Sequence, residues 1–357
     1  MQEVDISAAQ AGQRLDRYLH RILPNAATGF LYRMLRKKNI TLNGARAQGN
    51  ETLSPGDRIQ FFFSDETYAK FSGSPESAGS SDGDASKGAC GGTEERIREC
   101  RTAYTKLKKI DVVYEDSHII ILNKPAGVLT QKAAEGDLSL NEWMIGYLLW
   151  QDPALEEELK GFMPSVCNRL DRNTSGLVLC GKTVAGLQFL SGCIRERTVR
   201  KFYRTICAGD IKSPMTVRGY LTKDAGKNRV RVTEEKREGG ESIETVFRPV
   251  CQKNGYTLLE VELITGKPHQ IRAHLASLGY PVIGDLKYGD AALNRKLRER
   301  YGLQSQLLHA FRVVFPQTQD AAGEALSGRT VEAACPQRFL RVQASLGLSE
   351  DAGCAAG

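Results

Sequence analysis

The order of apolar and polar residues at the start of the chain predicts two short helices and a small sheet. Apolar residues recur with helical spacing within 15–22 and again within 30–35. Two apolar runs follow at 40–42 and 59–63, and the turn-forming pair Asn43-Gly44 comes directly after the first of them. Such a pair between short apolar runs is typical of a β-hairpin. This part of the chain therefore predicts a small unit of helices and antiparallel strands.

Beyond residue 110 the same kind of pattern predicts a larger domain of the α+β class. Strand-like runs occupy 112–113, 119–122, 177–180, 199–207, 256–264 and 308–315, and helical patterns occupy 138–149, 184–194 and 269–278. The helices do not alternate regularly with the strands. A mixed, largely antiparallel sheet with flanking helices is therefore expected in preference to a doubly wound sheet.

The composition changes abruptly between these two regions. Residues 72–93 are almost wholly Gly, Ser, Ala and Asp, without a residue that could anchor a core. A tether of this kind spans roughly 25 Å and would let the first unit move independently. We accordingly divide the chain into a first domain at 1–71, a flexible linker with a basic segment at 72–109, a large domain at 110–345 and a disordered tail at 346–357.

The charge of the chain suits a polyanionic partner. The 357 residues carry a formal net charge of +7, and basic proteins attract nucleic acids over long distances. From residue 1 to 60, nine Arg or Lys residues stand against five acidic ones. Four of the basic residues, Arg33, Arg36, Lys37 and Lys38, gather at the end of the second predicted helix, where they would either contact RNA or form a solvated helix face.

Cysteine usage and hydropathy indicate the compartment. Nine cysteines occur without a C-x-x-C pair, which predicts free thiols in a reducing environment. No apolar run approaches the roughly 18 residues that a membrane helix needs. We expect a cytoplasmic protein that acts as a monomer, without a membrane partner.

The most informative run is a polar turn, Asn168-Arg-Leu-Asp-Arg-Asn-Thr-Ser-Gly176, placed directly before the apolar strand at 177–180. Turns of this composition are common as purely structural features. The same turn would also hold the carboxylate of Asp171 at a fixed place beside the sheet. Composition alone leaves both interpretations open.

Two other patterns predict no ligand. The run from Gly176 to Thr183 satisfies the phosphate-loop pattern G-x-x-x-x-G-K-[ST], but its interior, Leu-Val-Leu-Cys, is an apolar strand. We therefore expect no nucleotide cofactor. His269 and His274 are five residues apart in a predicted helix, so their side chains point to different faces. No metal site and no other cofactor are predicted.

Several ordered motifs resemble those of the RluA/RluC/RluD family of pseudouridine synthases. The Asp171 turn is similar to the family signature R-L-D-x-x-T-S-G-L, and other matching segments follow the same order along the chain: Asp111–Gly127, Lys201-Phe-Tyr203, Thr265–Leu275 with Gly284-Asp285 and Tyr288-Gly289, and Leu308-His-Ala310. The resemblance implies the pseudouridine synthase fold with a central cleft, and an enzyme that isomerises specific uridines to pseudouridine in RNA, with large-subunit ribosomal RNA as the expected substrate.

The resemblance also implies roles for individual residues. Asp171 would be the catalytic carboxylate, and Tyr203 would stack on the uracil and could remove the proton from its carbon 5. Arg272 would pair with Asp171 and favour its charged form. Arg169 would contact the RNA and could fill the space left by an everted base, and Leu308 would line the uracil pocket.

The first unit resembles a second family. L-D-R-Y-L near the start, R-x-x-L-R-K-K in the middle and L-N-G after it are similar to the S-four-type (alpha-L) RNA-binding module of a small-subunit ribosomal protein. This resemblance covers about 60 residues. It implies that the basic residues of the second helix bind RNA.

The sequence departs from the synthase pattern at two places. Asn168 stands where the family usually has His, and Lys267-Pro268 replaces Arg-Thr. Both departures put substrate contacts in question rather than the reaction. Two alternatives remain: a non-catalytic RNA-binding or ribosome-assembly factor on the same fold, and a carbohydrate hydrolase that uses Asp171 with Asp285.

Overall fold

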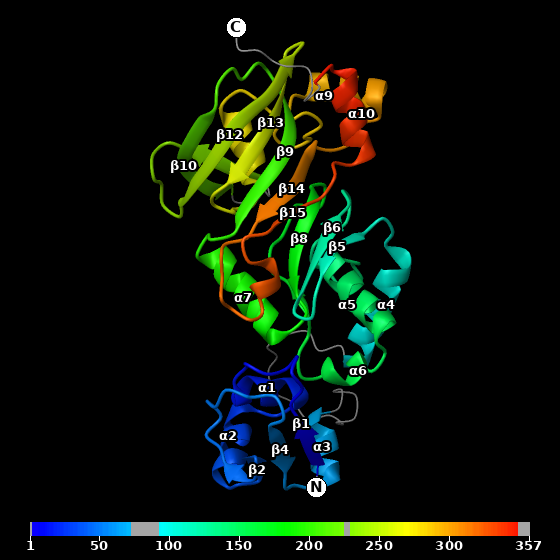
Figure 1. Ribbon diagram of the computed structural model, residues 1–357, viewed down its shortest axis with the longest axis vertical. Helices are drawn as coiled ribbons and strands as arrows, with labels where there is room; N and C mark the ends of the chain where they lie inside the picture. Colours follow the sequence, from blue (N-terminus) through cyan, green and yellow to red (C-terminus); the bar gives the residue numbers. More distant parts are fainter. Residues whose placement is uncertain (1, 73–92, 225–228, 349–357) are drawn as a thin grey trace.

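The computed structural model describes residues 2–72, 93–224 and 229–348, which form two units, each built on its own sheet (Figure 1). The first unit contains a four-stranded antiparallel sheet in the order β1-β4-β2-β3. Its elements are β1 (Gln2–Asp5), α1 (Leu15–Ile22), α2 (Thr28–Arg36), β2 (Ile40–Leu42), β3 (Ala45–Arg46), β4 (Arg58–Phe61) and α3 (Asp65–Ser72). The two helices and the hairpin predicted for this region are confirmed, whereas β1 and α3 were not predicted.

Helical periodicity builds the core of the first unit. Leu15 and Leu19 on α1, and Leu31 and Leu35 on α2, point inward and are almost fully buried against the sheet. The basic residues at the end of α2 stay exposed. The apolar stripe of each helix therefore faces the sheet while the charged stripe of α2 faces solvent.

The first unit is docked on the large unit, where the composition of the linker predicted independent movement. The buried side chain of Gln10 donates to the Glu158 carbonyl at 3.0 Å, and Gln188 donates to the Gly12 carbonyl at 3.0 Å. Gly161 lies so close that a Cβ there would approach Tyr18 to 2.4 Å. Polar contacts and close packing hold the unit in this position; residues 73–92 of the predicted linker lie outside the described residues.

The large unit is built on an eleven-stranded mixed sheet. Nine strands run in the order β11-β10-β12-β13-β9-β14-β8-β6-β5, with β15 beside β14 and β7 beside β8. All pairings are antiparallel except that of β14 with β8. The strands are β5 (Asp111–Glu115), β6 (Ile119–Lys124), β7 (Ser165–Val166), β8 (Ser175–Gly181), β9 (Arg200–Ala208), β10 (Met215–Asp224), β11 (Arg229–Thr233), β12 (Glu241–Lys253), β13 (Tyr256–Leu263), β14 (Leu308–Val314) and β15 (Thr330–Glu332). The predicted α+β class is confirmed.

Helices cover the sheet in several groups (Figure 1). They are α4 (Thr93–Lys106), α5 (Leu140–Gln151), α6 (Leu155–Glu158), α7 (Val184–Arg195), α8 (Gln270–Ser277), α9 (Ala291–Tyr301), the short 3-10 helix η2 (Glu324–Leu326) and α10 (Gln337–Ser345). Ser139 caps α5 and Thr183 caps α7 by accepting backbone N–H groups. None of the helices in the described ranges combines the length and apolar character that a transmembrane helix needs.

Both faces of the central strands are covered, which explains their continuous apolar runs. On β8, Val178 and Cys180 join the core that contains α5, whereas Leu177 and Leu179 join the core that contains α7. Residues on a strand alternate between faces, so a strand buried on both sides is apolar throughout. The predicted strand at 177–180 is confirmed, and with it the conclusion that these residues do not form a phosphate loop.

Two predicted boundaries were wrong. Residues 93–106, assigned to the linker and basic segment, form α4, whose Ile97, Cys100 and Ala103 are buried in the core of the large unit. A Cβ at Gly146 would lie 2.2 Å from the Cys100 carbonyl oxygen, so α4 and α5 pack backbone to backbone. Leu348, assigned to the disordered tail from 346 onward, is fully buried; residues 349–357 lie outside the described residues.

Candidate active site

The loop that carries Asp171 lies between β7 and β8 and is held by side chains on both sides. Asn168 accepts the Leu179 N–H at 2.7 Å, and Thr130 exchanges hydrogen bonds with both the N–H and the carbonyl of Leu170. The departure from the family pattern at Asn168 therefore has a structural use in this chain, because the amide fixes the loop to β8.

Gly176 allows the loop to end beside a neighbouring strand. Its φ is +118°, and a Cβ there would lie 2.2 Å from the Ala310 carbonyl oxygen of β14. This close approach occurs where β8 and β14 run parallel, since Gly176 pairs with Ala310. A side chain at 176 would push the strands apart directly behind the Asp171 loop.

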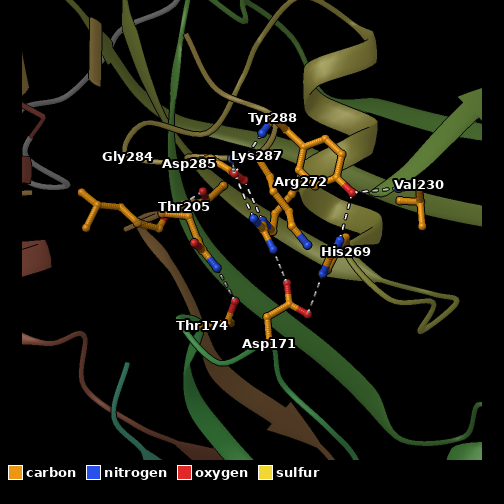
Figure 2. Close-up of polar contacts among 12 residues, drawn as sticks. Asp171, Thr174, Thr205, Val230, His269, Arg272, Gly284, Asp285, Lys287 and Tyr288 are labelled. Carbon is orange, nitrogen blue, oxygen red and sulfur yellow. Dashed lines mark hydrogen bonds and ion pairs between the residues drawn. The ribbon is translucent and has the colours of Figure 1, made fainter. Parts of the chain in front are cut away.

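Arg272 on α8 joins two carboxylates that lie far apart in the sequence. Its Nη1 donates to Asp171 Oδ2 at 2.7 Å, while Nε and Nη2 donate to Asp285 at 2.6 and 2.9 Å (Figure 2). Burial opposes the charged form of Arg272, but the hydrogen bonds and charge of Asp285, together with Asp171, raise its pKa above the ordinary value. The guanidinium is therefore a permanent cation in a fixed orientation.

Asp285 completes this arrangement from a fully buried position. It has no exposed surface, and its Oδ1 also accepts the backbone N–H groups of Lys287 and Tyr288. Burial raises the pKa of Asp285, but the Arg272 contact outweighs burial and the pKa is lowered overall. This position argues against the hydrolase alternative, because Asp285 has no exposed surface with which to face a sugar.

Lys124, at the end of β6, holds the Asp171 loop through hydrogen bonds from a fully buried side chain. Its fully buried ammonium donates to the carbonyls of Pro125, Val128 and Arg172 at 3.1, 2.8 and 3.0 Å. Burial lowers the pKa of Lys124 to about 7, and the charge of Asp171 opposes this shift. The side chain ties the end of β6 to the residue that follows Asp171.

His269 and Tyr288 approach Asp171 from the other side. His269 Nε2 lies 4.0 Å from Asp171 Oδ1, and its Nδ1 lies 2.9 Å from the Tyr288 hydroxyl (Figure 2). The Arg272 guanidinium stacks over the Tyr288 ring at 5.3 Å. Both oxygens of Asp171 therefore face nitrogen atoms of side chains from α8 and the residue before it.

Asp171 opens into a cleft of about 820 Å³. Tyr203 on β9 and Leu308 on β14 line the cleft, and both are largely buried. Burial, reinforced by the charge of Asp171, raises the pKa of Tyr203 well above its ordinary value. The phenol is therefore protonated at neutral pH and offers an apolar ring with a neutral hydroxyl.

The walls of the cleft are basic. Among the described residues that line the cleft, Asp171 is the single acidic one. Seven lining residues are cationic: Lys132, Arg169, Arg197, Lys201, Lys223, Lys267 and Arg272. Arg169 is exposed, close to Asp171 in the chain. A cleft with this charge balance favours a polyanionic ligand.

The structure brings together the five residues predicted for the large domain and leaves the other four elsewhere. Asp171, Tyr203, Arg272, Arg169 and Leu308 all line one cleft. Arg33, Arg36, Lys37 and Lys38 lie on the first unit and are exposed.

Sequence reasoning missed the supporting residues of the site. Lys124, His269, Asp285 and Tyr288 stand in segments that were quoted for the family resemblance, but no role in the synthase reaction was predicted for them; His269 was weighed as a metal ligand and Asp285 as a hydrolase residue. Lys124 ends an apolar strand, where a buried ammonium is unexpected. A charged residue at the end of the largely buried strand β6 was the signal available for Lys124.

Comparisons with known proteins agree with this geometry. Residues 118–277 match the family of RNA pseudouridylate synthases. The chain is 31% identical over 321 residues to ribosomal large subunit pseudouridine synthase C of Vibrio vulnificus, which covers 88% of each chain, and 30% identical over 328 residues to the protein of that name from Escherichia coli, which covers 90% of each. The solved structure of human RNA pseudouridylate synthase domain containing 4 shares the fold, with a TM-score of 0.51 and 18% identity over 71% of this chain and 97% of that chain.

The basic cleft around one carboxylate and the similarity to pseudouridine synthases together define an enzyme that acts on RNA. The chain belongs to the RluA-type family of RNA pseudouridine synthases. It is an isomerase that converts uridine to pseudouridine in RNA.

Proposed function

We propose that Asp171 is the catalytic carboxylate of this synthase and that its substrate is large-subunit ribosomal RNA. The observation that supports the catalytic assignment is the position of Asp171, the single acid in a basic cleft, held by Arg272 at 2.7 Å. The names of the relatives, which are ribosomal large subunit pseudouridine synthases, support the choice of substrate.

The reaction requires one carboxylate and no group donor. The bond between uracil nitrogen 1 and the anomeric carbon breaks, the base turns in place, and carbon 5 bonds to the sugar and then loses its proton. Asp171 attacks the sugar and forms an ester, as in retaining glycosidases, or it assists loss of the base by another proton-transfer or covalent route. Either route needs a carboxylate held beside the ribose, and the Arg272 contact at 2.7 Å fixes the orientation of that carboxylate.

Tyr203 stacks on the uracil in this proposal. Its ring lies in the cleft, and stacking of a base on an aromatic ring is worth about 1–3 kcal/mol. Burial keeps the hydroxyl of Tyr203 protonated at rest. The ring contributes stacking, and removal of the carbon-5 proton by this side chain stays a prediction. Leu308 lines the apolar side of the uracil pocket.

Cations at the cleft bind the RNA backbone. Within the described residues, no carboxylate is paired with Arg169, Arg197, Lys201 or Lys223. Phosphates would supply the missing negative charge. Arg169, exposed beside Asp171, would fill the space that the everted uridine leaves in the RNA.

The first unit binds RNA as an S-four-type module through Arg33, Arg36, Lys37 and Lys38. Their exposure and common sign support this assignment. We further propose that the protein acts as a monomer in the cytoplasm, where a reducing environment would keep buried thiols such as those of Cys100, Cys180 and Cys207 unoxidised.

Substitution of the carboxylate tests the catalytic assignment. Asp171→Asn keeps the size of the side chain and its contact with Arg272, but it abolishes isomerisation while RNA affinity stays within about threefold. Release of tritium from uracil carbon 5 measures turnover, and filter binding measures affinity. Pseudouridine formation by the Asp171→Asn protein, detected by mass spectrometry, would reject the assignment. A separate experiment, which maps pseudouridines in RNA from cells that lack the protein, identifies the modified position.

A further inference from the structure

His269 has a backbone conformation that residues other than glycine seldom adopt. Its φ is +56°, in the left-handed region, and it directly precedes α8 without a side-chain cap. Such strained residues concentrate at functional sites, where the surrounding structure fixes them. This conformation places the imidazole in the cleft that contains Asp171 (Figure 2).

The hydrogen bonds around His269 assign its proton. The Tyr288 hydroxyl oxygen accepts the backbone N–H of Val230 at 3.0 Å and lies 2.9 Å from His269 Nδ1. A phenol has a single proton to donate, and among the described residues the acceptor that the Tyr288 hydroxyl contacts is Nδ1. When Tyr288 donates to Nδ1, a neutral imidazole must carry its own proton on Nε2.

The protonated nitrogen is the one that faces the carboxylate. Nε2 lies 4.0 Å from Asp171 Oδ1, whereas Oδ2 already accepts from Arg272. Burial lowers the pKa of His269, and the attraction of Asp171 is opposed by Arg272 and Lys287, so the ring is neutral at pH 7. A neutral N–H therefore points toward the Asp171 oxygen that Arg272 does not engage.

We propose that His269 is a positioning residue for Asp171, with its tautomer set by Tyr288. The inference rests on the proposed role of Asp171 as catalytic carboxylate. Arg272 fixes Oδ2, and the attraction of the Nε2–H dipole restricts rotation of the carboxylate at Oδ1 without neutralising it. At 4.0 Å the N–H is too distant to occupy Oδ1 as a full hydrogen bond would.

Nitrogen-15 NMR of the full chain with labelled histidine tests the tautomer directly. The chain has five histidines, and the signals missing from His269→Asn assign those of His269; asparagine tolerates the left-handed backbone better than most residues. We expect protonation on Nε2 in the unchanged protein and loss of that preference in Tyr288→Phe. Protonation on Nδ1 in the unchanged protein overturns the proposal.

Kinetics test whether the tautomer matters. Tyr288→Phe keeps the ring and lowers kcat about tenfold, with KM for RNA unchanged within about twofold. The double substitution with His269→Asn is no slower than His269→Asn alone, because both changes act through one interaction. Additive losses, or a raised KM with kcat unchanged, overturn the proposal. His20→Asn and Tyr301→Phe are matched controls outside the cleft.

The two proposals fail in different ways. If Asp171→Asn retains isomerisation, the assignment of Asp171 is wrong whatever the tautomer of His269. If Asp171→Asn abolishes turnover while Tyr288→Phe leaves kcat unchanged, only the role of His269 is wrong.

Discussion

Asp285 holds Arg272 by two hydrogen bonds, at 2.6 and 2.9 Å, and leaves Nη1 of the same guanidinium directed at Asp171 (Figure 2). The buried carboxylate is thus the fixed end of the array and Asp171 is its solvent-facing end. Because the guanidinium is planar and rigid, fixing two of its nitrogens also fixes the third.

Asp285→Asn removes the charge that compensates Arg272 while it keeps the size of the side chain. Breaking one partner of a buried ion pair costs about 3–5 kcal/mol, since the remaining charge stays buried. We expect the free energy of unfolding in urea to fall by about this amount, and kcat to fall with it. Asp210→Asn, at an exposed residue, is the control. Equal urea midpoints for Asp285→Asn and the unchanged protein would contradict the role given to Asp285.

Lys124 makes stability depend on pH in an unusual direction for a lysine. Its pKa in the folded chain is about 7, below the ordinary value of 10.5, so the unfolded chain binds more protons between these values. Stability therefore rises with pH across this window, by at most about 1.4 kcal/mol per pH unit. Lys124→Met removes this contribution. The unfolding free energy of the unchanged protein minus that of Lys124→Met therefore increases from pH 7 to pH 8.5.

The buried thiols set the highest pH at which this effect of Lys124 can be measured. Burial raises the pKa of Cys100 and Cys207 to about 12, so these groups oppose the trend once cysteines of the unfolded chain ionise. Lys212→Met, at an exposed lysine, serves as the control. Parallel curves of unfolding free energy against pH for Lys124→Met and the unchanged protein would show that Lys124 does not titrate as described.

The basic residues of α2 are expected to act on RNA affinity and not on chemistry. Replacing Arg33, Arg36, Lys37 and Lys38 together by Gln should weaken binding and reduce the slope of log affinity against log salt by about 0.7–0.9 for each phosphate that is no longer neutralised. The rate of isomerisation at saturating RNA should stay the same. Binding isotherms at several salt concentrations measure the slope.

A matched control lies on α9, where Arg295, Lys296, Arg298 and Arg300 are also basic. Replacing these four by Gln changes the net charge of the protein equally. If both sets of substitutions reduce the slope equally, the effect comes from overall charge and not from an RNA-binding face on α2.

Local sequence was sufficient to predict helices and strands wherever the buried residues follow one regular pattern along the chain. The strand at 177–180 is apolar throughout because both of its faces are covered, and the helix at 184–194 has a capping Thr183 directly before it. The pattern failed for α4, where three inward residues are dispersed among charges. It also failed for β10 to β12, whose alternation of polar and apolar residues is interrupted by charged side chains.

The sequence by itself determined that one polar turn precedes a buried strand, that its motifs are those of a pseudouridine synthase, and that Asp171 is the carboxylate to examine. Only the tertiary structure decided that Asp285 orients Arg272, that Lys124 supports the loop and that His269 faces Oδ1. Asp171 and Arg272 are 101 residues apart. Periodicity reports which side of an element is buried, whereas the partner of a buried charge depends on distances that exist only after the sheet has assembled.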